Sequence, residues 1–320
     1  MATISGMFCV PSTLDQIQGN IFGTFDNRMS LLISIFLPIS TLLIITGMYV
    51  LNDLFDADLD RINGKTNRPI PSGKVSKGHA LLFVVVTNVI GLSVPVFSNN
   101  QLGIVLASVI ALIGILYSLP KVSLKDKYII KTCAIGIAMA SSLLLGASNY
   151  LHEDFRTGTD IGNVFRWTSG HLEGLMLYPV YAAIMLFMMV FVTSPLNDLG
   201  DIRGDREAGR RTIPIVIGKV NTVRLSLLIT IGIAFLSWML YANSNSYGEG
   251  DWTGLHDNII AIPIVLPLAV SGTCFLIIFH LLKVLKQMED QNYIRESVSK
   301  KSMPLHLLLQ FSLVIGFLLQ

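Results

Sequence analysis

Long apolar runs separated by short polar segments organise the whole chain. The first run covers about residues 29–51, and most of the others are of similar length. Each is close to the roughly 20 residues that an α-helix needs to cross a hydrocarbon core about 30 Å thick. The pattern therefore predicts an all-α, integral, multi-pass membrane protein. The expected spans are residues 29–51, 79–97, 101–118, 129–148, 174–194, 225–243, 258–283 and 303–319.

Composition agrees with this fold class. The chain has 320 residues, 52% of them hydrophobic, and a mean hydropathy of +0.62. Its three cysteines lie far apart and form no CxxC or Cys/His cluster, so neither a zinc site nor a disulfide framework is expected. Residues 1–28 mix apolar and polar positions, which predicts an interfacial or partial first helix. Residues 29–320 are expected to form a single transmembrane domain.

The 23 Lys and Arg residues are divided unevenly between the two sides of the predicted bundle. Most of them follow the first, third, fifth and seventh expected spans, and the opposite side holds few. Cytoplasmic loops of membrane proteins carry an excess of Lys and Arg. The distribution therefore predicts that these four basic segments face the cytosol.

Two copies of one aspartate-rich pattern follow two of the apolar runs. Residues 52–60 read NDLFDADLD and residues 197–205 read NDLGDIRGD, so both copies have the form N-D-x-x-D-x-x-x-D. Such a repeat is not expected by chance in a chain with only 14% charged residues. Ionisable groups beside a membrane span are costly and usually functional. A merely solvated acidic surface is the alternative interpretation.

The spacing within the first copy predicts one functional face. If the helix continues past Leu51, then Asp53, Asp56 and Asp60 fall on one stripe of its surface, and Asp58 lies off that stripe. Oxygen ligands suit Mg²⁺, which usually takes one or two protein carboxylates and completes its shell with water and substrate phosphate. We expect the two clusters to face one anionic group on the cytosolic side. The predicted metal ligands are Asn52, Asp53, Asp56, Asp60, Asn197, Asp198, Asp201 and Asp205, with Asn52 either a neutral oxygen ligand or a support for the helix end.

The two motifs and their tails resemble those of the UbiA superfamily of intramembrane prenyltransferases. The tails are NRPIPSG at residues 67–73 and GDREAGRRTIP at residues 204–214, and the similarity extends from about residue 29 to the C-terminus. The resemblance implies a bundle of eight or nine transmembrane helices, arranged as two similar four-helix halves around a central cavity. It also implies that the aspartates hold Mg²⁺ on a prenyl diphosphate, with Asp53, Asp56, Asp198 and Asp201 as the catalytic residues.

Basic residues near the motifs are candidates for neutralising a diphosphate. Arg68 is followed by two prolines that stiffen its loop, which would hold its guanidinium ready for phosphate oxygens. Lipid headgroups are its alternative partners. Further candidates are Lys121, Lys125 and Arg206, whereas Lys127, Arg210 and Arg211 are explained by orientation alone. Tyr117 ends a predicted span and is expected to face a carbocation through a cation–π contact, unless it is an ordinary interfacial tyrosine.

The sequence thus favours Mg²⁺-dependent ionisation of a polyprenyl diphosphate, such as geranylgeranyl diphosphate, and transfer of the prenyl group to a lipid or other small-molecule acceptor. The short segment before residue 29 leaves open a terpene cyclase of the same superfamily, in which the substrate's own double bonds capture the cation. A transporter or channel is the third class, but its carboxylates are expected nearer to the middle of the membrane. Nucleic acid is not expected as a partner.

Overall fold

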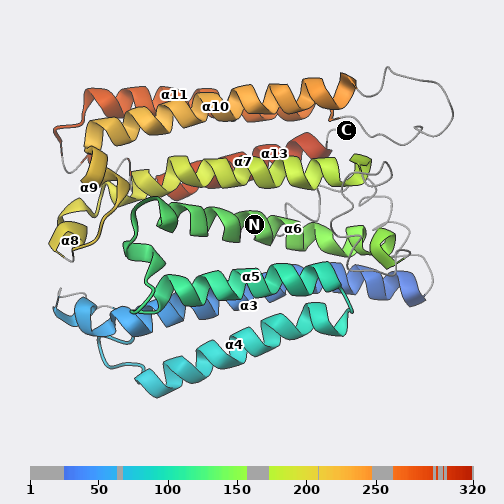
Figure 1. The fold of residues 1–320 in the computed structure, drawn as a ribbon, viewed down its shortest axis with the longest axis horizontal. Helices are drawn as coiled ribbons and strands as arrows, with labels where there is room; N and C mark the ends of the chain where they lie inside the picture. The colour runs from blue at the N-terminus through green and yellow to red at the C-terminus, as the bar shows by residue number, and fades with distance from the viewer. Residues whose placement is uncertain are drawn as a thin grey trace.

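The computed structural model describes residues 25–62, 68–156, 173–207, 209–246, 262–290, 293–294, 298 and 301–318. All regular structure in these ranges is helical (Figure 1). The long helices are α3 (Phe25–Ile62), α4 (Lys77–Phe97), α5 (Gln101–Ser118), α6 (Tyr128–Arg156), α7 (Glu173–Asp198), α10 (Lys219–Ser246), α11 (Val265–Lys286) and α13 (Ser302–Leu318). Three short helices join them: η1 (Leu124–Asp126), α8 (Ile202–Glu207) and α9 (Ile213–Ile217).

The long helices form two groups of four. Helices α3, α4, α5 and α6 pack against one another, as do α7, α10, α11 and α13, and the main contact between the groups is made by α6 and α7 (Figure 1). Seven of the eight are long and apolar enough to cross a membrane, and α13 contains a shorter apolar helix, Pro304–Gly316. The predicted all-α bundle of two four-helix halves is therefore confirmed. The central cavity stays a prediction.

Several boundaries differ from those read from the apolar runs. Helix α3 continues eleven residues beyond residue 51 and so carries the entire first aspartate motif. Helix α6 extends to Arg156, well beyond the predicted end at residue 148. Most of the 258–283 span is helical, but α11 begins only at Val265. The expectation for residues 1–28 lies almost wholly outside the described residues.

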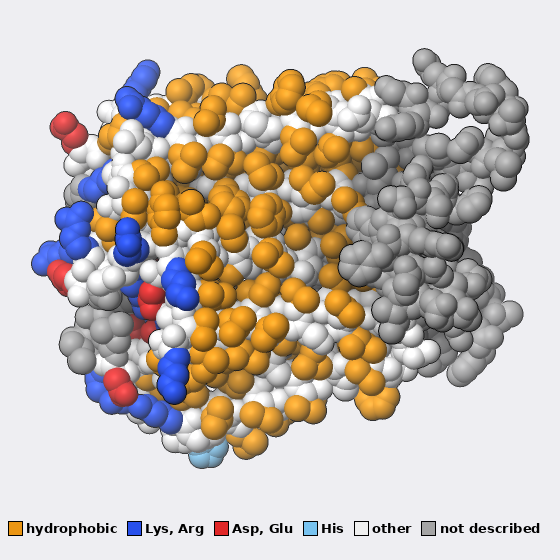
Figure 2. Space-filling view, viewed as in Figure 1, with side chains coloured by type: hydrophobic (Ala, Val, Ile, Leu, Met, Phe, Trp, Pro, Cys, Tyr) orange, Lys and Arg blue, Asp and Glu red, His pale blue; other side chains and the backbone are white. Residues whose placement is uncertain are grey.

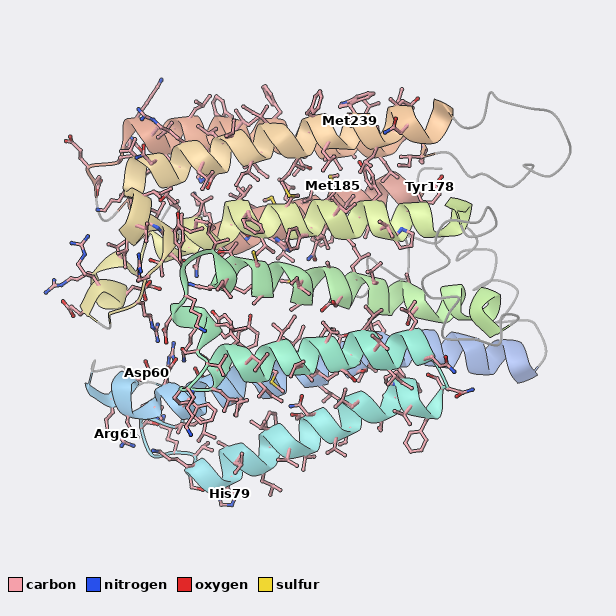
Figure 3. The ribbon with its side chains drawn as sticks, in the orientation of Figure 1. Asp60, Arg61, His79, Tyr178, Met185 and Met239 are labelled. Carbon is pink, nitrogen blue, oxygen red and sulfur yellow. The ribbon has the colours of Figure 1, made fainter. Side chains whose placement is uncertain are left out.

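Apolar side chains cover the flanks of the bundle, as Figure 2 shows for one face. Helix α7 is the most enclosed, with 72% of its apolar span buried, whereas only 22% of the α10 span is buried. The largest buried cluster forms around α7 and includes Tyr178, Met185 and Leu196. In Figure 3, Tyr178 and Met185 lie along this helix. Helix α7 is therefore the central helix of the second half.

Charge is confined to one end of the molecule. Among the side chains that the structure describes, every Lys, Arg, Asp and Glu lies where α3, α5, α7 and α11 end and where α4, α6, α10 and α13 begin. We call this the charged end; it is the left end in Figures 1 and 2. Both aspartate motifs lie there because each follows a helix that runs towards that end.

Small and polar residues let helices approach closely inside the first half. The Ser40 hydroxyl of α3 donates to the Gly91 carbonyl of α4 over 2.6 Å. Asn100 accepts from the Gly103 amide at the start of α5 and donates to the buried Ser148 hydroxyl of α6. Buried polar groups need such partners where no water is available. These contacts fix the helix packing that sets the position of the first motif.

Candidate active site

The first aspartate motif lies on the last turns of α3, where Asp53 and Asp60 face the site and Asp58 faces the surface. Asp53 and Asp60 share one partner, because Arg68 Nη1 donates to Asp53 Oδ1 at 2.9 Å and to Asp60 Oδ2 at 2.6 Å. The Asp60 carboxylate is only 6% exposed, whereas that of Asp58 is 67% exposed and pairs with Lys77. In Figure 3, Asp60 lies near the end of α3. The predicted stripe, with Asp58 off it, is present.

A compact loop holds Arg68 in this position. The Ser72 amide donates to the Arg68 carbonyl, and the Val75 amide donates to that of Pro69. Ile70 is buried between Ala57 of α3 and Ala80 of α4. This anchoring restricts the Arg68 guanidinium to the neighbourhood of the aspartates, as the proline-stiffened segment predicted.

The loop between α5 and α6 brings a second cation to the first motif. Lys125 Nζ donates to Asn52 Oδ1 at 3.0 Å and to Asp56 Oδ1 at 2.7 Å, and its side chain is nearly buried. Ser123 turns the chain there with a φ of +37° and donates from its hydroxyl to Asp126. An ammonium group this enclosed needs charged or oxygen partners. Lys125 therefore lies at the first motif, and its predicted role as a diphosphate ligand stays a prediction.

The second motif spans a break between two helices. Helix α7 ends at Asp198, Asp201 lies in the turn, and Asp205 lies on the short helix α8. Pro195 does not cause this break, because α7 continues for three residues beyond it. Asp198 and Asp205 are buried, whereas Asp201 and Asn197 are exposed. The two copies of the motif therefore share a sequence pattern but differ in backbone.

Lys131 of α6 is the partner of the second motif. Its Nζ donates to Asp198 Oδ1 at 2.5 Å, and both side chains are largely buried. Partly buried Tyr117, at the end of α5, lies within electrostatic range of this pair. Burial raises the pKa of Asp205, and the cationic Lys131 only partly offsets this effect.

Arg210 joins the two motifs. Its Nη2 lies 3.6 Å from Asp56 Oδ1 on α3, and its Nη1 lies 3.5 Å from Asp205 Oδ1 on α8. Its Nε lies 3.0 Å from Asp126 Oδ1 in η1. Burial lowers the pKa of Arg210, but these three carboxylates outweigh burial and raise it. The expected convergence of the two aspartate clusters is therefore present, with one guanidinium between them.

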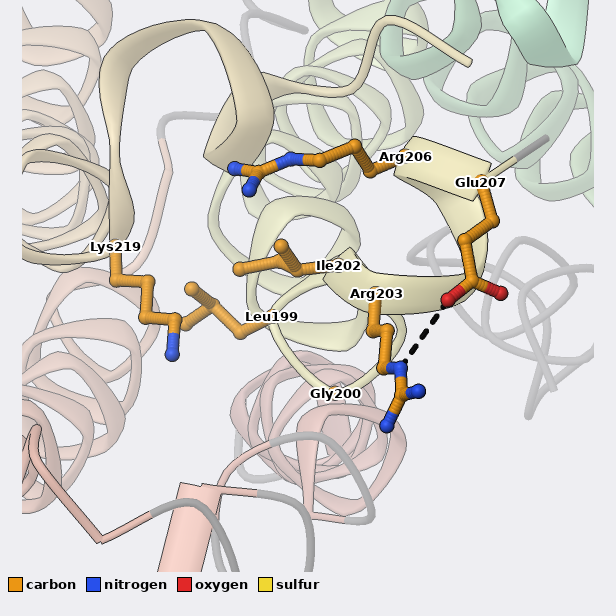
Figure 4. A pocket seen from close by; sticks show the side chains of 7 residues that line it. All are labelled: Leu199, Gly200, Ile202, Arg203, Arg206, Glu207 and Lys219. Carbon is orange, nitrogen blue, oxygen red and sulfur yellow. Dashed lines mark hydrogen bonds and ion pairs between the residues drawn. The ribbon is translucent and has the colours of Figure 1, made fainter. Parts of the chain in front are cut away.

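Two predicted diphosphate ligands lie elsewhere. Lys121 is exposed on the loop after α5 and forms no ion pair with any residue in the described parts of the chain. Arg206 points away from the aspartates, because it follows Asp205 on α8 and consecutive helical residues face directions about 100° apart. It lines a separate pocket of about 320 Å³ beside α8 (Figure 4). That pocket is formed by Leu199, Gly200, Ile202, Arg203, Arg206, Glu207 and Lys219.

Three site residues were not singled out from the sequence. Arg210 adjoins the exposed Arg211, and nothing in the sequence separates the two. Lys131 lies in the first turn of a predicted span, where orientation alone explains a basic residue. Asp126 belongs to a loop without a recognised motif. These three residues share only their closeness in space to an aspartate motif, and this closeness cannot be read from the sequence.

The donor set suits a hard cation such as Mg²⁺, since it consists of carboxylate and amide oxygens. Each of five motif carboxylates is paired with a cation, and no three such ligands converge on one point within the described ranges. Mg²⁺ usually needs only one or two protein carboxylates. The residues therefore fit the ion chemically, provided that the basic side chains exchange partners when it binds.

A bundle of apolar helices with paired aspartate motifs at one end is the arrangement expected of an intramembrane prenyltransferase. The sequence model of the UbiA prenyltransferase family matches residues 23–281. The chain belongs to this family, and it is an integral, multi-pass membrane protein.

Named relatives and solved structures agree with this assignment. The digeranylgeranylglyceryl phosphate synthase of Methanopyrus kandleri is 26% identical over 240 residues, which cover 74% of this chain and 76% of the relative. That of Methanoregula boonei is 30% identical over 203 residues, or 63% of each chain. Two solved structures share the fold. The apo UbiA homologue from Aeropyrum pernix K1 has a TM-score of 0.61 at 19% identity, covering 98% of this chain and 97% of its own. The Archaeoglobus fulgidus homologue bound to DMAPP and Mg²⁺ has a TM-score of 0.58 at 17% identity, covering 99% and 95%.

Proposed function

We propose that this protein ionises a polyprenyl diphosphate at the charged end and transfers the prenyl group to an acceptor, in a reaction that depends on Mg²⁺. The observation that carries the proposal is the meeting of both aspartate motifs at Arg210. A diphosphate placed there is within reach of carboxylates and cations from both halves of the bundle.

The metal ligands in this proposal come from both motifs. Asp53 and Asp56 would hold metal on the α3 side, and Asp198 and Asp201 on the α7 side, with Asn52, Asp60, Asn197 and Asp205 as further oxygen donors. Mg²⁺, when bound, supplies positive charge that neutralises the diphosphate oxygens. Arg68, Lys125, Lys131 and Arg210, which pair with the carboxylates, then become donors to those oxygens. Exposed Asp201 has no competing ion pair among the described residues and is open to a ligand.

The reaction begins with cleavage of the bond between the allylic carbon and the diphosphate oxygen. The bonding electrons leave with the oxygen, where the basic side chains stabilise the added charge. The allylic cation that remains is taken up by a nucleophilic oxygen of the acceptor, which then loses a proton. Tyr117 lies within electrostatic range of the Lys131–Asp198 pair, and its ring would face the cation.

The distribution of charge supports a cytosolic position for this site. All described Lys and Arg side chains lie at the charged end, and such an excess is typical of the cytoplasmic side. Diphosphates carry too much charge to cross a bilayer core unaided. A site open to the cytosol can therefore bind the diphosphate group of the substrate directly from water. The prenyl chain of the substrate then lies among the apolar helices.

The acceptor is proposed from the relatives' names. They make digeranylgeranylglyceryl phosphate, so a glyceryl phosphate lipid carrying one geranylgeranyl chain is the first acceptor to test. The decisive experiment incubates purified protein with Mg²⁺ and geranylgeranyl diphosphate, with and without this lipid, and identifies the products by mass spectrometry. We expect the doubly prenylated lipid and diphosphate only when acceptor and Mg²⁺ are both present.

Two other outcomes would change this assignment. A cyclic hydrocarbon or alcohol formed without acceptor would establish the cyclase instead. Diphosphate release that is unaffected by chelation of Mg²⁺ would exclude the metal-dependent ionisation itself.

A further inference from the structure

Arg210 has more anionic partners than any other described cation at the charged end. It lies 3.0 Å from Asp126, 3.5 Å from Asp205 and 3.6 Å from Asp56, and these residues belong to η1, α8 and α3 respectively. Arg68 and Lys131, by contrast, each serve one motif only. Arg210 is thus the single described side chain with an ion pair to both motifs.

The backbone around Arg210 is built to hold the guanidinium there. The Arg210 amide donates to the Asp205 carbonyl at 2.9 Å, and the Arg211 amide donates to the Asp126 carbonyl at 3.3 Å. Gly209 precedes it with a φ of +69°, a conformation that favours glycine. The Arg210 side chain is 25% exposed, whereas that of Arg211 is exposed. Two consecutive arginines therefore have opposite environments.

We propose that Arg210 is an internal counter-ion that holds the two aspartate motifs together while no metal is bound, and that it competes with the metal for Asp56 and Asp205. The proposal rests on the proposed function, since it assigns metal binding to the same motifs. Without a cation between them, the carboxylates of the two motifs would repel each other across the interface of the two halves. A guanidinium suits this role because its planar fork can contact several carboxylates at once.

This role predicts that a substitution of Arg210 strengthens the binding of a divalent cation, whereas most substitutions in a binding site weaken binding. Removal of the arginine leaves an extra unit of negative charge beside Asp56 and Asp205, so a divalent cation should bind more tightly. Charges a few ångströms apart interact by several kcal/mol near a protein surface, and part of this is screened. The affinity for the cation should therefore rise on the order of tenfold. The metal-free protein should become less stable at the same time.

The experiment compares wild type, Arg210→Gln and the matched control Arg211→Gln in detergent. Mn²⁺, which prefers the same oxygen ligands as Mg²⁺, is titrated without diphosphate, and the free ion is measured by electron paramagnetic resonance. Thermal unfolding is followed with and without Mg²⁺. For Arg210→Gln we expect tighter Mn²⁺ binding and a lower unfolding temperature that Mg²⁺ restores towards the wild-type value. Arg211→Gln should match wild type in both measurements.

The outcomes separate this inference from the proposed function. If Arg210→Gln binds Mn²⁺ as wild type does, or more weakly, Arg210 is not a competing counter-ion, although the metal-dependent reaction can still hold. If none of the three proteins binds Mn²⁺ without diphosphate, the inference is overturned, and the proposed function is decided separately by the Mg²⁺ dependence of product formation. Should Arg210→Gln not fold, Arg210→Lys decides through stability. The ammonium group keeps the charge but cannot contact Asp56 and Asp205 through separate nitrogens. A lower unfolding temperature that Mg²⁺ restores is therefore expected, and an unchanged unfolding temperature overturns the inference.

Discussion

Asp53 and Asp58 lie five residues apart on α3, yet their surroundings are unlike. Asp53 faces Arg68 and the rest of the site, and Asp58 pairs with Lys77 and Arg61 at the surface. Exposed ion pairs of this kind contribute little to stability. The two aspartates therefore form a matched pair with which to test the role of the motif.

Asp53→Asn keeps the shape of the side chain and one oxygen but removes the charge that would hold a metal. We expect turnover to fall by about a hundredfold or more, as for loss of one strong electrostatic contact to the transition state. Asp58→Asn should stay within about twofold of wild type. Initial rates at saturating geranylgeranyl diphosphate measure both effects. Equal inactivity of the two variants would refute the single metal-facing stripe.

Sequence spacing predicted the functional face of the first motif because a regular helix carries it. Arg210 and Arg211 show where such inference ends. The two residues have the same chemistry and adjoin each other, and only the turn at Gly209 and the packing of η1 decide which one faces inward. The orientation of Arg206 could not be predicted from the sequence for a similar reason. It depends on α8, a helix too short to leave a periodic signal.

At the scale of elements, the second motif shows that one sequence pattern can take two backbone forms. The first copy lies within continuous α3, whereas the second is divided between α7 and α8. The helix break exposes Asp201 and turns Asp205 inward, towards Arg210. The apolar runs predicted all eight long helices. The predicted ends of α3 and α6 were too early, because polar and charged residues continue these helices beyond the apolar segments.

Close packing of α3 on α4 gives an element-scale prediction. A Cβ atom at Gly91 would lie 2.7 Å from the Ile44 side chain and 3.0 Å from the Ser40 carbonyl oxygen. Gly91→Leu should therefore separate the helices and cost about 1–3 kcal/mol, as overpacking does in protein cores. We expect a drop of several degrees in the unfolding temperature in detergent.

Gly272 of α11 is the control for this substitution. It is exposed, and a Cβ atom there would meet nothing within 4 Å. Gly272→Leu should leave the unfolding temperature nearly unchanged. A similar loss in both variants would show that helix flexibility, rather than contact between α3 and α4, is what Gly91 supplies.

At the scale of the whole molecule, the charged end predicts the orientation in the membrane. Lys74 is exposed at the charged end, and Gln101 is exposed at the opposite end, where α5 begins. We expect Lys74→Cys to react with a membrane-impermeant maleimide only after spheroplasts are opened. Gln101→Cys should react in intact spheroplasts. Both variants require a background in which Cys9, Cys133 and Cys274 are replaced by serine. The reverse labelling pattern would contradict the cytosolic site.

Confinement of all described charged side chains to one end also bears on the energetics of a living membrane. A unit charge that crosses a bilayer exchanges about 2.3 kcal/mol with a potential of 100 mV. In the proposed reaction the diphosphate would bind and leave at the boundary, and the part of the substrate within the bundle would be hydrocarbon. Almost no charge moves through the voltage drop during a catalytic cycle. We therefore expect such an enzyme to work equally well in an energised and in a depolarised membrane, with a rate set by substrate supply and not by the electrical state of the cell.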